Sequence, residues 1–500
     1  MSPRRTALTA LRGRPVLVAG AGISGLASAV ALAELGAQVT VADEAADRLV
    51  ALPDGVRGEL GLTEPPPGTA LVVTSPGWRP DAPLLVAAAR AGIEVIGEPE
   101  LAWRWTTAGG PGAGGPGVRW LGVTGTNGKT TTVGMLEAIL RAAGRDAVAC
   151  GNVGTPVIDA VRGADRERSG GERAGGERPG GEQSGGERAG GEQSATGPRE
   201  LAVELSSFQL YWSPSLRPAA GCLLNIAEDH LDWHGGMADY LAAKARVLTG
   251  AVAVAGVDDP LVADTLAAAP APRRVGLTMG APGPGQLGVL DGTLVDRAFG
   301  GAGPLELAEA AEVRPAGPPG VLDALAAAAL ARVVGVTPDQ VRAGLREFAP
   351  APHRGGVVGE VGGVRFVNDS KATNPHAAAA ALGGHARVVW IAGGLLKGAS
   401  VTELISQHAH RLAGVVLLGT DRAMFRDALL RHAPNVPITE VPPGHDSPMT
   451  DAVRMAAAMA APGDVVLLAP AAASFDQFAG YADRGRAFQA AVAELPAVAR

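Results

Sequence analysis

The chain has few cysteines and few aromatic residues. Only Cys150 and Cys222 occur among 500 residues, and neither lies in a CxxC or related metal-binding spacing. The sequence therefore predicts no disulfide framework and no cysteine-based metal site, and it favours two buried thiols in a reducing compartment. Aromatic residues make up 4% of the chain, and the heavy use of alanine and glycine predicts many helices and turns built from small residues.

An excess of positive charge and a long apolar run are absent as well. The net charge is -7 at pH 7, which argues against a nucleic-acid partner. The apolar stretch 321–336 contains Asp323 and Arg332 and is interpreted as a core helix, not a membrane span. Arg4 and Arg5 are not followed by the apolar stretch of a secretion signal, so we expect a cytoplasmic protein.

The remaining sequence alternates short β-branched runs with helical stretches. Five hundred residues exceed one compact core and predict two to four domains. In the first hundred residues, strands are predicted at 16–19, 38–42 and 70–74, with a helix over 24–35. This alternation is typical of a parallel sheet built from βαβ units. The Gly- and Pro-rich stretch 106–117 is interpreted as a domain linker.

Two further α/β regions follow this linker. Strands are predicted at 120–123, 201–205 and 222–226, with helices over 130–143 and 237–247, and later strands at 364–367, 388–392, 415–418 and 465–469. Residues 170–194 repeat five-residue units such as GGERA and GGEQS. Because this repeat contains almost no apolar side chains, it predicts a solvated, disordered insertion in preference to a binding element.

Two glycine-rich loops are candidates for phosphate binding. Residues 20–25 (GAGISG) follow a strand and open a helix, and Asp43 ends the next strand, as in dinucleotide-binding folds. A purely structural turn remains the alternative for this loop. Residues 125–130 (GTNGKT) give the stronger signal, although Val123 stands where a first glycine is usual. Lys129 can reach the β- and γ-phosphates, and the Thr130 hydroxyl can bind Mg²⁺.

Several segments resemble the Mur ligase family, to which the folylpolyglutamate synthetases are related. Residues 124–132 (TGTNGKTTT) are similar to the family's nucleotide loop. Further matches follow in the family's order and span nearly the whole chain: 204–210 (ELSSFQL), 225–230 (NIAEDH), 240–244 (YLAAK), 368–374 (NDSKATN) and 474–478 (SFDQF). ELSSFQL and NDSKATN resemble the D-glutamate-adding branch, because sister ligases carry different sequences at these two places.

The resemblance implies an α/β fold of three domains. These are an N-terminal Rossmann-like domain for a UDP-sugar (1–106), a central P-loop ATPase-type domain (107–350) with a disordered insertion at about 165–199, and a C-terminal Rossmann-like domain for the incoming amino acid (351–500). The implied substrates are ATP, D-glutamate and UDP-N-acetylmuramoyl-L-alanine, with two Mg²⁺ ions. We expect a monomer that binds small molecules only.

The implied ATP and catalytic residues cluster at the second loop. Predicted ATP contacts are Gly125, Thr126, Asn127, Gly128, Lys129, Thr130, Thr131, Asp323, Arg354 and Asp369. Predicted catalytic residues are Lys129, Glu204, His230, Lys244 and Lys371, the last stabilising the transferring phosphoryl charge. Glu204 would end a strand facing the loop, where a carboxylate oxygen suits Mg²⁺; a structural ion pair is its alternative.

The metal ligands implied by the resemblance are Thr130, Glu204, His230 and Lys244. The family's counterpart of Lys244 is carbamylated by CO₂ and helps to hold the second Mg²⁺. A lysine beside divalent cations would be repelled unless it were neutralised or converted. An ordinary surface lysine on the helix over 237–247 is the alternative.

The resemblance also assigns the two remaining substrates. Predicted UDP-sugar contacts are Gly22, Ile23, Ser24, Asp43, Asn152, Ser206, Gln209 and His230. Predicted D-glutamate contacts are Thr373, Lys397, Ser474, Phe475 and Tyr481. A lysine with hydroxyls and backbone amides is what a dicarboxylate requires. Surface polar residues on loops remain the alternative, above all for Lys397 and Tyr481.

One segment departs from the family pattern. Residues 317–325 read GPPGVLDAL, so Gly320 and Asp323 replace two asparagines. An ionised aspartate can accept a hydrogen bond from adenine but cannot donate one, which predicts altered adenine binding. This departure leaves open a silent, scaffold-like relative, and another amide ligase of the superfamily is a second alternative. GAGISG alone would also fit an NAD-dependent dehydrogenase, but the second phosphate loop argues against that.

Overall fold

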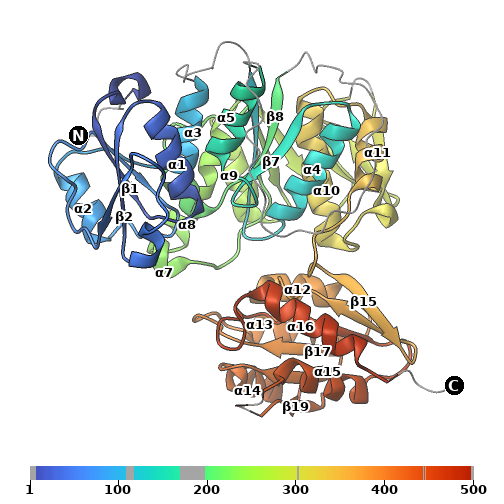
Figure 1. Cartoon of the computed structure of the whole chain (residues 1–500). Helices are drawn as coiled ribbons and strands as arrows, with labels where there is room; N and C mark the ends of the chain where they lie inside the picture. Colours follow the sequence, from blue (N-terminus) through green and yellow to red (C-terminus); the bar gives the residue numbers. More distant parts are fainter. Residues whose placement is uncertain are drawn as a thin grey trace.

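The strands form three separate α/β sheets. The computed structural model describes residues 7–107, 117–168, 198–300, 303–442, 444 and 446–496, and its strands form sheets of five, nine and six members. Each sheet uses one continuous stretch of the chain, as the colours in Figure 1 show. The predicted α/β class with three domains is confirmed. Within the described ranges, no helix is both long and apolar enough to cross a membrane.

The N-terminal sheet is parallel throughout, with the order β3-β2-β1-β4-β5. Its strands are β1 (Pro15–Ala19), β2 (Gln38–Asp43), β3 (Arg57–Leu60), β4 (Leu71–Thr74) and β5 (Val95–Gly97), and its helices are α1 (Ile23–Glu34), α2 (Pro83–Arg90) and α3 (Glu98–Thr107). The strand order reverses between β1 and β4. The loops that leave these two strands therefore meet at a switch point, where parallel sheets bind ligands.

The central sheet has the order β14-β13-β12-β11-β10-β9-β6-β8-β7. Its strands are β6 (Val118–Thr124), β7 (Ala147–Gly151), β8 (Arg199–Glu204), β9 (Ala220–Leu223), β10 (Val252–Gly256), β11 (Arg273–Leu277), β12 (Gln286–Leu290), β13 (Thr293–Asp296) and β14 (Leu305–Glu309). The last two pair antiparallel and extend an otherwise parallel sheet.

Eight α-helices accompany this sheet among the described residues. They are α4 (Lys129–Ala142), α5 (Val157–Arg168), α6 (Ser207–Tyr211), α7 (Leu231–His234), α8 (Met237–Ala245), α9 (Pro260–Ala268), α10 (Pro318–Val333) and α11 (Pro338–Glu347). The alanine-rich α10 is buried along most of its length beside α4, which confirms the prediction of a core helix. Small side chains let these two helices approach closely.

The C-terminal sheet has the order β15-β16-β20-β17-β18-β19, and only β15 is antiparallel to its neighbour. Its strands are β15 (Gly356–Val361), β16 (Val364–Asn368), β17 (Val388–Gly393), β18 (Leu412–Leu418), β19 (Ile438–Glu440) and β20 (Val465–Leu468). Its helices are α12 (Pro375–Gly383), α13 (Thr402–His408), α14 (Arg422–His432), α15 (Pro448–Met459) and α16 (Tyr481–Ala493).

The first two domains share a hydrophobic core, whereas the C-terminal domain has its own. One continuous cluster of buried side chains joins Leu32 and Trp105 of the N-terminal domain to Trp120 and Val157 of the central domain. Polar contacts reinforce this interface: Glu98 accepts from the backbone amide of Ile158 at the start of α5 (2.7 Å). The clusters of the C-terminal domain contain only residues beyond 363.

The predicted elements differ from the structure mainly at their ends. The strand predicted at 222–226 is wrong for its last three residues, because β9 ends at Leu223 where the chain turns beside the phosphate loop. The helix predicted over 237–247 ends at Ala245 and continues as a 3-10 turn. Thr106 and Thr107 belong to α3, and residues 108–116 of the predicted linker lie outside the described residues, as does the repeat at 170–194.

Candidate active site

The phosphate loop connects β6 to α4 and leaves backbone amides at a helix N-terminus. Gly128 precedes α4 with φ of +86°, and a Cβ atom there would lie 2.2 Å from the Oδ1 atom of Asp323. Glycine is therefore required at this position for both its conformation and its lack of a side chain. An anion placed against this turn meets free N–H groups and the positive end of the helix dipole.

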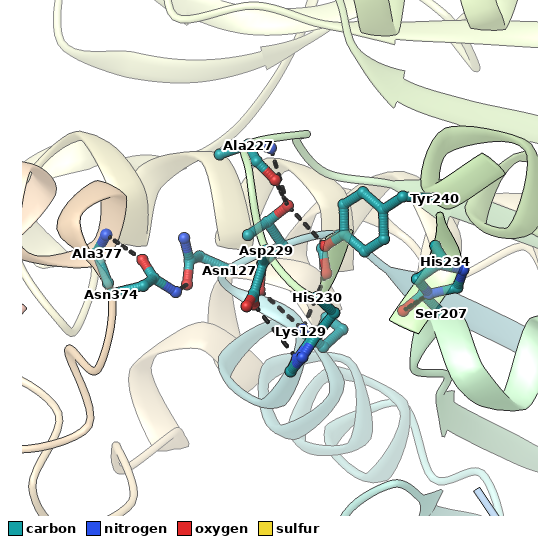
Figure 2. A network of polar contacts seen from close by, with 12 residues as sticks. Asn127, Lys129, Ser207, Ala227, Asp229, His230, His234, Tyr240, Asn374 and Ala377 are labelled. Carbon is teal, nitrogen blue, oxygen red and sulfur yellow. Dashed lines mark hydrogen bonds and ion pairs between the residues drawn. The ribbon is translucent and has the colours of Figure 1, made fainter. Parts of the chain in front are cut away.

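A set of polar contacts fixes the loop from behind. The Thr126 hydroxyl lies 3.0 Å from the Tyr240 hydroxyl and accepts from the backbone amide of Ala227 (2.9 Å), as Figure 2 shows. Asn225 holds the next residue from both sides, because its Oδ1 atom accepts from the Asn127 amide (2.9 Å) and its Nδ2 atom donates to the Asn127 carbonyl (3.2 Å). Tyr240 and Asn225 thus set the shape of the loop.

A cleft of about 520 Å³ lies between the phosphate loop and the C-terminal domain. The central domain contributes Thr126 to Thr131, Asn152, Glu204, His230 and Lys244 to its walls, and the C-terminal domain contributes Arg354, Asp369, Lys371 and Thr373. Apart from Gly125, the predicted ATP and catalytic residues therefore line one cavity, although they are spread over more than 240 positions of sequence.

Lysine is rare in this chain and concentrated at the cleft. The only four lysines are Lys129, Lys244, Lys371 and Lys397. The first three line the cleft. The fourth, Lys397, lies close to His230, which lines the cleft. Burial lowers the pKa of His230, and the nearby charge of Lys397 lowers it further. Lys129, Lys371 and Arg354 give this cleft a positive charge that suits a polyanion.

Lys129 lies at the centre of this charge. Its Nζ atom donates to the carbonyls of Gly125 (2.9 Å) and Thr126 (2.9 Å) within its own loop. Burial lowers the pKa of Lys129, while the carboxylates of Glu204 and Asp229 oppose that shift. A bound phosphate would add a further negative charge next to this amine and favour its charged form.

Lys244 is not the surface lysine allowed as an alternative from the sequence. Its side chain is 2% exposed, and its Nζ atom donates to the Gly125 carbonyl (2.7 Å) and lies 4.8 Å from the centre of the Tyr240 ring. Burial, followed by repulsion from Lys129, holds the pKa of Lys244 well below its usual value. This shift favours the uncharged form of the amine, which is the nucleophilic form of lysine.

Glu204 offers a free carboxylate oxygen to the cleft. It ends β8 and pairs with Val123, directly before the phosphate loop, as predicted. Its Oε1 atom accepts from the Asn152 side chain (2.9 Å), whereas its buried Oε2 atom has no hydrogen-bond partner. An unpaired buried carboxylate oxygen in the cleft that Thr130 also lines fits a divalent cation. Among the described residues, no group of three or more His, Cys, Asp and Glu could hold a metal unaided, so phosphate oxygens would complete the ligand set.

His230 lines the cleft from the central domain. Its Nε2 atom is 3.5 Å from Asp229, and its ring packs against Phe208 at 4.7 Å. The backbone at His230 has φ of +54°, immediately before α7. Next to it, His234 is buried and hydrogen-bonded to the Ser207 hydroxyl (2.9 Å), and burial lowers its pKa to about 4. His230 faces the cleft, while His234 is a neutral part of the supporting core.

The C-terminal domain presents a cation above an aromatic ring. The Nζ atom of Lys371 lies 4.1 Å from the centre of the Tyr481 ring. Burial, followed by the charge of Arg354, lowers the pKa of Lys371 to about 8. Burial also raises the pKa of Asp369 to about 7. The position of Tyr481 suggests support for Lys371, and its predicted contact with D-glutamate remains a prediction.

Two loops of the C-terminal domain bring most of the predicted D-glutamate-binding residues together. Leu395 and Ala473 exchange two backbone hydrogen bonds of 2.9 Å. The contact places Lys397 beside Phe475, whose ring centre is 5.8 Å from the lysine Nζ atom. Phe475 is 68% exposed, whereas Ser474 is buried. Thr373 follows Lys371 closely in the chain and lines the cleft, whereas Lys397, Ser474 and Phe475 are not among its lining residues; their contacts with D-glutamate remain predictions.

Several residues predicted to contact the UDP-sugar make hydrogen bonds within the protein itself. The Asp43 carboxylate accepts from the amides of Ala21 (2.7 Å) and Ala45 (3.0 Å), so it holds the GAGISG loop in shape. Ser206 and Gln209 form a capping box at the start of α6. Gly22, Ile23 and Ser24 open α1, and the Ile23 side chain is exposed. Direct ligand contacts by these residues remain predictions.

Asp323 lies beneath the phosphate loop, not at an open surface. Its side chain is 4% exposed and accepts from the Thr132 hydroxyl (3.1 Å). Burial raises the pKa of Asp323 well above its usual value. A protonated carboxyl group can donate as well as accept. The contact between Asp323 and adenine and the loss of a donor expected from the sequence both remain predictions.

The sequence analysis missed several supporting residues. Arg484 is fully buried and donates to the hydroxyl and the carbonyl of Ser370 (3.0 and 2.9 Å), which fixes the loop that carries Lys371. Asn374 and His376 reach the phosphate loop from α12. A buried arginine nine residues before the end of a helix gives no local signal of this role. The scarcity of lysine, by contrast, could have drawn attention to all four lysines at once.

The fold and the cleft define a three-domain, nucleotide-dependent enzyme with a P-loop and a cationic site shared by two domains. Comparisons with known proteins agree. A family model described as "Mur ligase middle domain" matches residues 123–281, and one described as "Mur ligase, glutamate ligase domain" matches residues 353–472. The chain belongs to the Mur ligase family.

Curated relatives match over nearly the full length. The UDP-N-acetylmuramoylalanine--D-glutamate ligase of Rhodococcus jostii is 50% identical and covers 99% of this chain and 98% of its own length. The protein of the same name from Mycolicibacterium smegmatis is 51% identical, with 96% of both chains covered.

Solved structures share the fold at low sequence identity. MurF from Acinetobacter baumannii has a TM-score of 0.55 at 16% identity and covers 96% of this chain and 91% of its own. UDP-N-acetylmuramate-alanine ligase MurC from Thermotoga maritima has a TM-score of 0.52 at 17% identity, with 95% and 98% covered.

Proposed function

We propose that this protein uses ATP to join D-glutamate to UDP-N-acetylmuramoyl-L-alanine in the synthesis of peptidoglycan precursors. The names of the curated relatives, at about half identity over nearly the whole chain, support this reaction. The observation that carries the proposal is the convergence of Lys129, Arg354 and Lys371 from two domains on one cleft. A reaction that transfers the γ-phosphoryl group of ATP requires such a concentration of positive charge.

In the first step, an oxygen of the L-alanine carboxylate attacks the γ-phosphorus of ATP. A bond forms between the carboxylate oxygen and the γ-phosphorus. The bond between the γ-phosphorus and the β,γ-bridging oxygen breaks, and the products are an acyl phosphate and ADP. Lys129 and the amides of the phosphate loop neutralise charge on the β- and γ-phosphates, and Lys371 and Arg354 do so from the other side. The two carbonyls that now accept from Lys129 keep its amine directed along the loop.

In the second step, the D-glutamate amine attacks the acyl carbon and inorganic phosphate leaves. The amine attacks in its neutral form, and the proton that its nitrogen then loses passes to solvent as the tetrahedral intermediate collapses to the amide. The side chains available to hold the amino acid are Lys397, Ser474, Thr373, Phe475 and Tyr481, on the C-terminal domain. Because the acceptor and the ATP are held by different domains, the domains must align before either step can be fast.

Mg²⁺ would be held by Thr130 and Glu204 together with phosphate oxygens, and it would supply charge neutralisation for the transferring group. We further propose that Lys244 carries a carbamate, which with His230 would hold a second ion. The uncharged form of the Lys244 amine can attack CO₂ at carbon and release one proton, which leaves an anionic carbamate in place of the amine. Burial beside the phosphate loop lowers the pKa of Lys244 and so favours the form that reacts.

The test of the function is phosphate release by the purified chain with Mg²⁺, ATP and UDP-N-acetylmuramoyl-L-alanine. D-glutamate, L-glutamate, L-alanine and diaminopimelate are compared as acceptors. Release that requires D-glutamate supports the proposal. Release with another acceptor would indicate a different ligase, and no release with any acceptor would rule out the ligase activity.

Asn152 is expected to act through Glu204. Replacing Asn152 with alanine removes the amide that orients the Glu204 carboxylate, so half-maximal activity should require about 10- to 100-fold more Mg²⁺. The KM for the UDP-sugar should stay unchanged. The exposed Asn435 provides a matched control. A raised KM for the UDP-sugar with normal Mg²⁺ dependence would instead indicate that Asn152 contacts the substrate phosphates.

Lys371 is expected to give the pH profile its alkaline limb. The side chain is cationic below its pKa of about 8 and loses its charge as the pH rises through that value. The value of kcat/KM for ATP, which reports groups of the free enzyme, should therefore fall above about pH 8. Lys371→Arg keeps the charge to higher pH and should shift this limb upward while lowering the maximum. An unchanged limb in Lys371→Arg would exclude Lys371 as its source.

A further inference from the structure

Asn127 is held by the central domain through its backbone and by the C-terminal domain through its side chain. Asn225 fixes the backbone amide and carbonyl of Asn127 from within the central domain. The side chain leaves the loop toward the first turn of α12. There, the Nδ2 atom of Asn374 donates to Asn127 Oδ1 (3.3 Å), and Asn127 Nδ2 lies 2.8 Å from His376 Nδ1. Figure 2 shows Asn374 directed at Asn127.

One backbone amide determines the direction of each hydrogen bond in the series that joins Asn374, Asn127 and His376. The Ala377 amide can only donate, and it donates to Asn374 Oδ1 (2.8 Å). The Asn374 NH₂ group must therefore face Asn127 Oδ1. The NH₂ group of Asn127 then faces His376, so the Nδ1 atom of His376 must accept. The contact requires a neutral imidazole that carries its proton on Nε2.

We propose that Asn374 and His376 form a latch on Asn127 which joins the C-terminal domain to the phosphate loop and positions Lys371 for phosphoryl transfer. We refer to these three residues as the α12 latch. The inference rests on the proposed ligase function, because it assigns a positioning role in that reaction.

The position of Lys371 follows from the short, internally bonded segment that ends at the latch. Ala372 donates its amide to the Asp369 carbonyl (2.9 Å), and Thr373 donates to the Lys371 carbonyl (2.8 Å). Arg484 holds Ser370 from below. Lys371 is three residues before Asn374, and Lys129 is two residues after Asn127. A contact between Asn127 and Asn374 therefore fixes the two lysines relative to each other through very little chain.

The environment of His376 favours its neutral form. His376 is the second residue of α12, where the positive end of the helix dipole opposes a further positive charge. Burial also lowers the pKa of His376, and Asp259 at the start of α9 opposes this by raising it. Protonation would turn the accepting Nδ1 atom into a donor facing the NH₂ group of Asn127. Acid is therefore expected to open the latch.

A pair of substitutions separates the hydrogen bond from the bulk of the side chain. His376→Asn places an accepting oxygen the same number of bonds from Cα as Nδ1, but it cannot be protonated near neutral pH. His376→Leu keeps bulk without an acceptor. With saturating substrates, His376→Leu should lower kcat about three- to tenfold, as expected for one neutral hydrogen bond. His376→Asn should restore the rate and remove the acid-side fall that the wild type shows as His376 becomes protonated.

Outcomes of these assays decide between a latch and a structural role. His432, exposed at the end of α14, provides a matched His→Leu control that should not change the rate. In a double-mutant cycle, Asn127→Ala should abolish the difference between His376 and His376→Leu. Equal losses in His376→Leu and His376→Asn, or additive losses in the cycle, would overturn the proposal.

A second measurement does not depend on catalysis. Cys150 and Cys222 are buried, so fluorophores can be attached selectively to Ala268→Cys on α9 and Ala423→Cys on α14, both exposed positions. Energy transfer between them reports how the two domains approach each other with MgATP. His376→Leu should lower the high-transfer fraction about three- to tenfold, and an unchanged fraction would overturn the latch. A chain that closes but releases no phosphate would instead refute the ligase function alone.

Discussion

Replacement of Lys129 by alanine is expected to reduce phosphate release by about a thousandfold or more. Lys129 is one of four lysines in the chain, and its Nζ atom is held over the phosphate loop by two carbonyls. A neutral methyl group cannot balance charge on the β- and γ-phosphates. The phosphate loop and the first turn of α4 contain no other lysine or arginine. The measurement is the rate of phosphate release with all three substrates at saturation.

The fold should survive this substitution, because Lys129 makes its hydrogen bonds only within its own loop. Thermal unfolding of Lys129→Ala should match that of the wild type. Arg141 lies on the same helix, with its side chain 59% exposed, and Arg141→Ala serves as a control that should retain full activity. Retention of phosphate release within about tenfold in Lys129→Ala would show that this loop does not hold the reacting phosphates.

Lys244→Ala is expected to lower the rate of ligation by about a hundredfold or more. Two properties of Lys244 support a carbamate at this position: its amine is buried beside the phosphate loop, and its pKa lies well below the usual value. The wild-type protein should therefore lose activity in buffer stripped of CO₂ and regain it when bicarbonate is added. With ¹³C-labelled bicarbonate, the wild type should show a carbamate signal that Lys244→Ala lacks.

The small number of lysines makes this assignment simple. Only three other lysine side chains could carry a carbamate, and burial lowers the pKa of Lys244 well below its usual value. Lys371→Ala, measured in parallel, should keep the labelled signal even though its activity falls. A wild-type protein that is equally active with and without CO₂, and shows no signal, would mean that Lys244 acts as the free amine.

Local sequence was sufficient for the elements and for the main loop. The parallel strands are buried on both faces, so β1, β6, β17 and β20 stand out as continuous apolar runs. The segment GTNGKT combines a required glycine with a lysine and a hydroxyl at a strand-to-helix junction. The ends of β9 and α8 were missed because tertiary contacts, not residue preferences, decide where these elements stop.

Partners of polar side chains could not be read from the sequence. Asn152 is a predicted UDP-sugar contact, and nothing in the sequence indicated that its amide donates to Glu204, 52 positions away. Asp43 is another predicted UDP-sugar contact, and the sequence did not show that its carboxylate accepts from the Ala21 amide of the GAGISG loop. The α12 latch joins residues 249 positions apart. Each of these contacts depends on how strands are ordered in a sheet or how domains meet, and no spacing along the chain reports that.

The ionisation of buried groups was equally hidden. Asp323 replaces an asparagine of the family pattern, and the sequence suggested a lost donor. The structure buries its carboxyl against Gly128 and Thr132, which raises the pKa of Asp323 and so favours the protonated form. A carboxyl group in that form can donate as well as accept, as an amide can. Only the burial, which depends on the packing of α10 on α4, distinguishes these two outcomes.

The hydrophobic core shared by the first two domains determines how this protein unfolds. Since one apolar cluster runs from Leu32 through Trp105 to Trp120 and Val157, exposing either domain's half of it costs the other domain its packing as well. These two domains therefore behave as one cooperative unit, in which a destabilising substitution in either is felt by both. The C-terminal domain, with its own clusters, is the part free to unfold or to be exchanged separately.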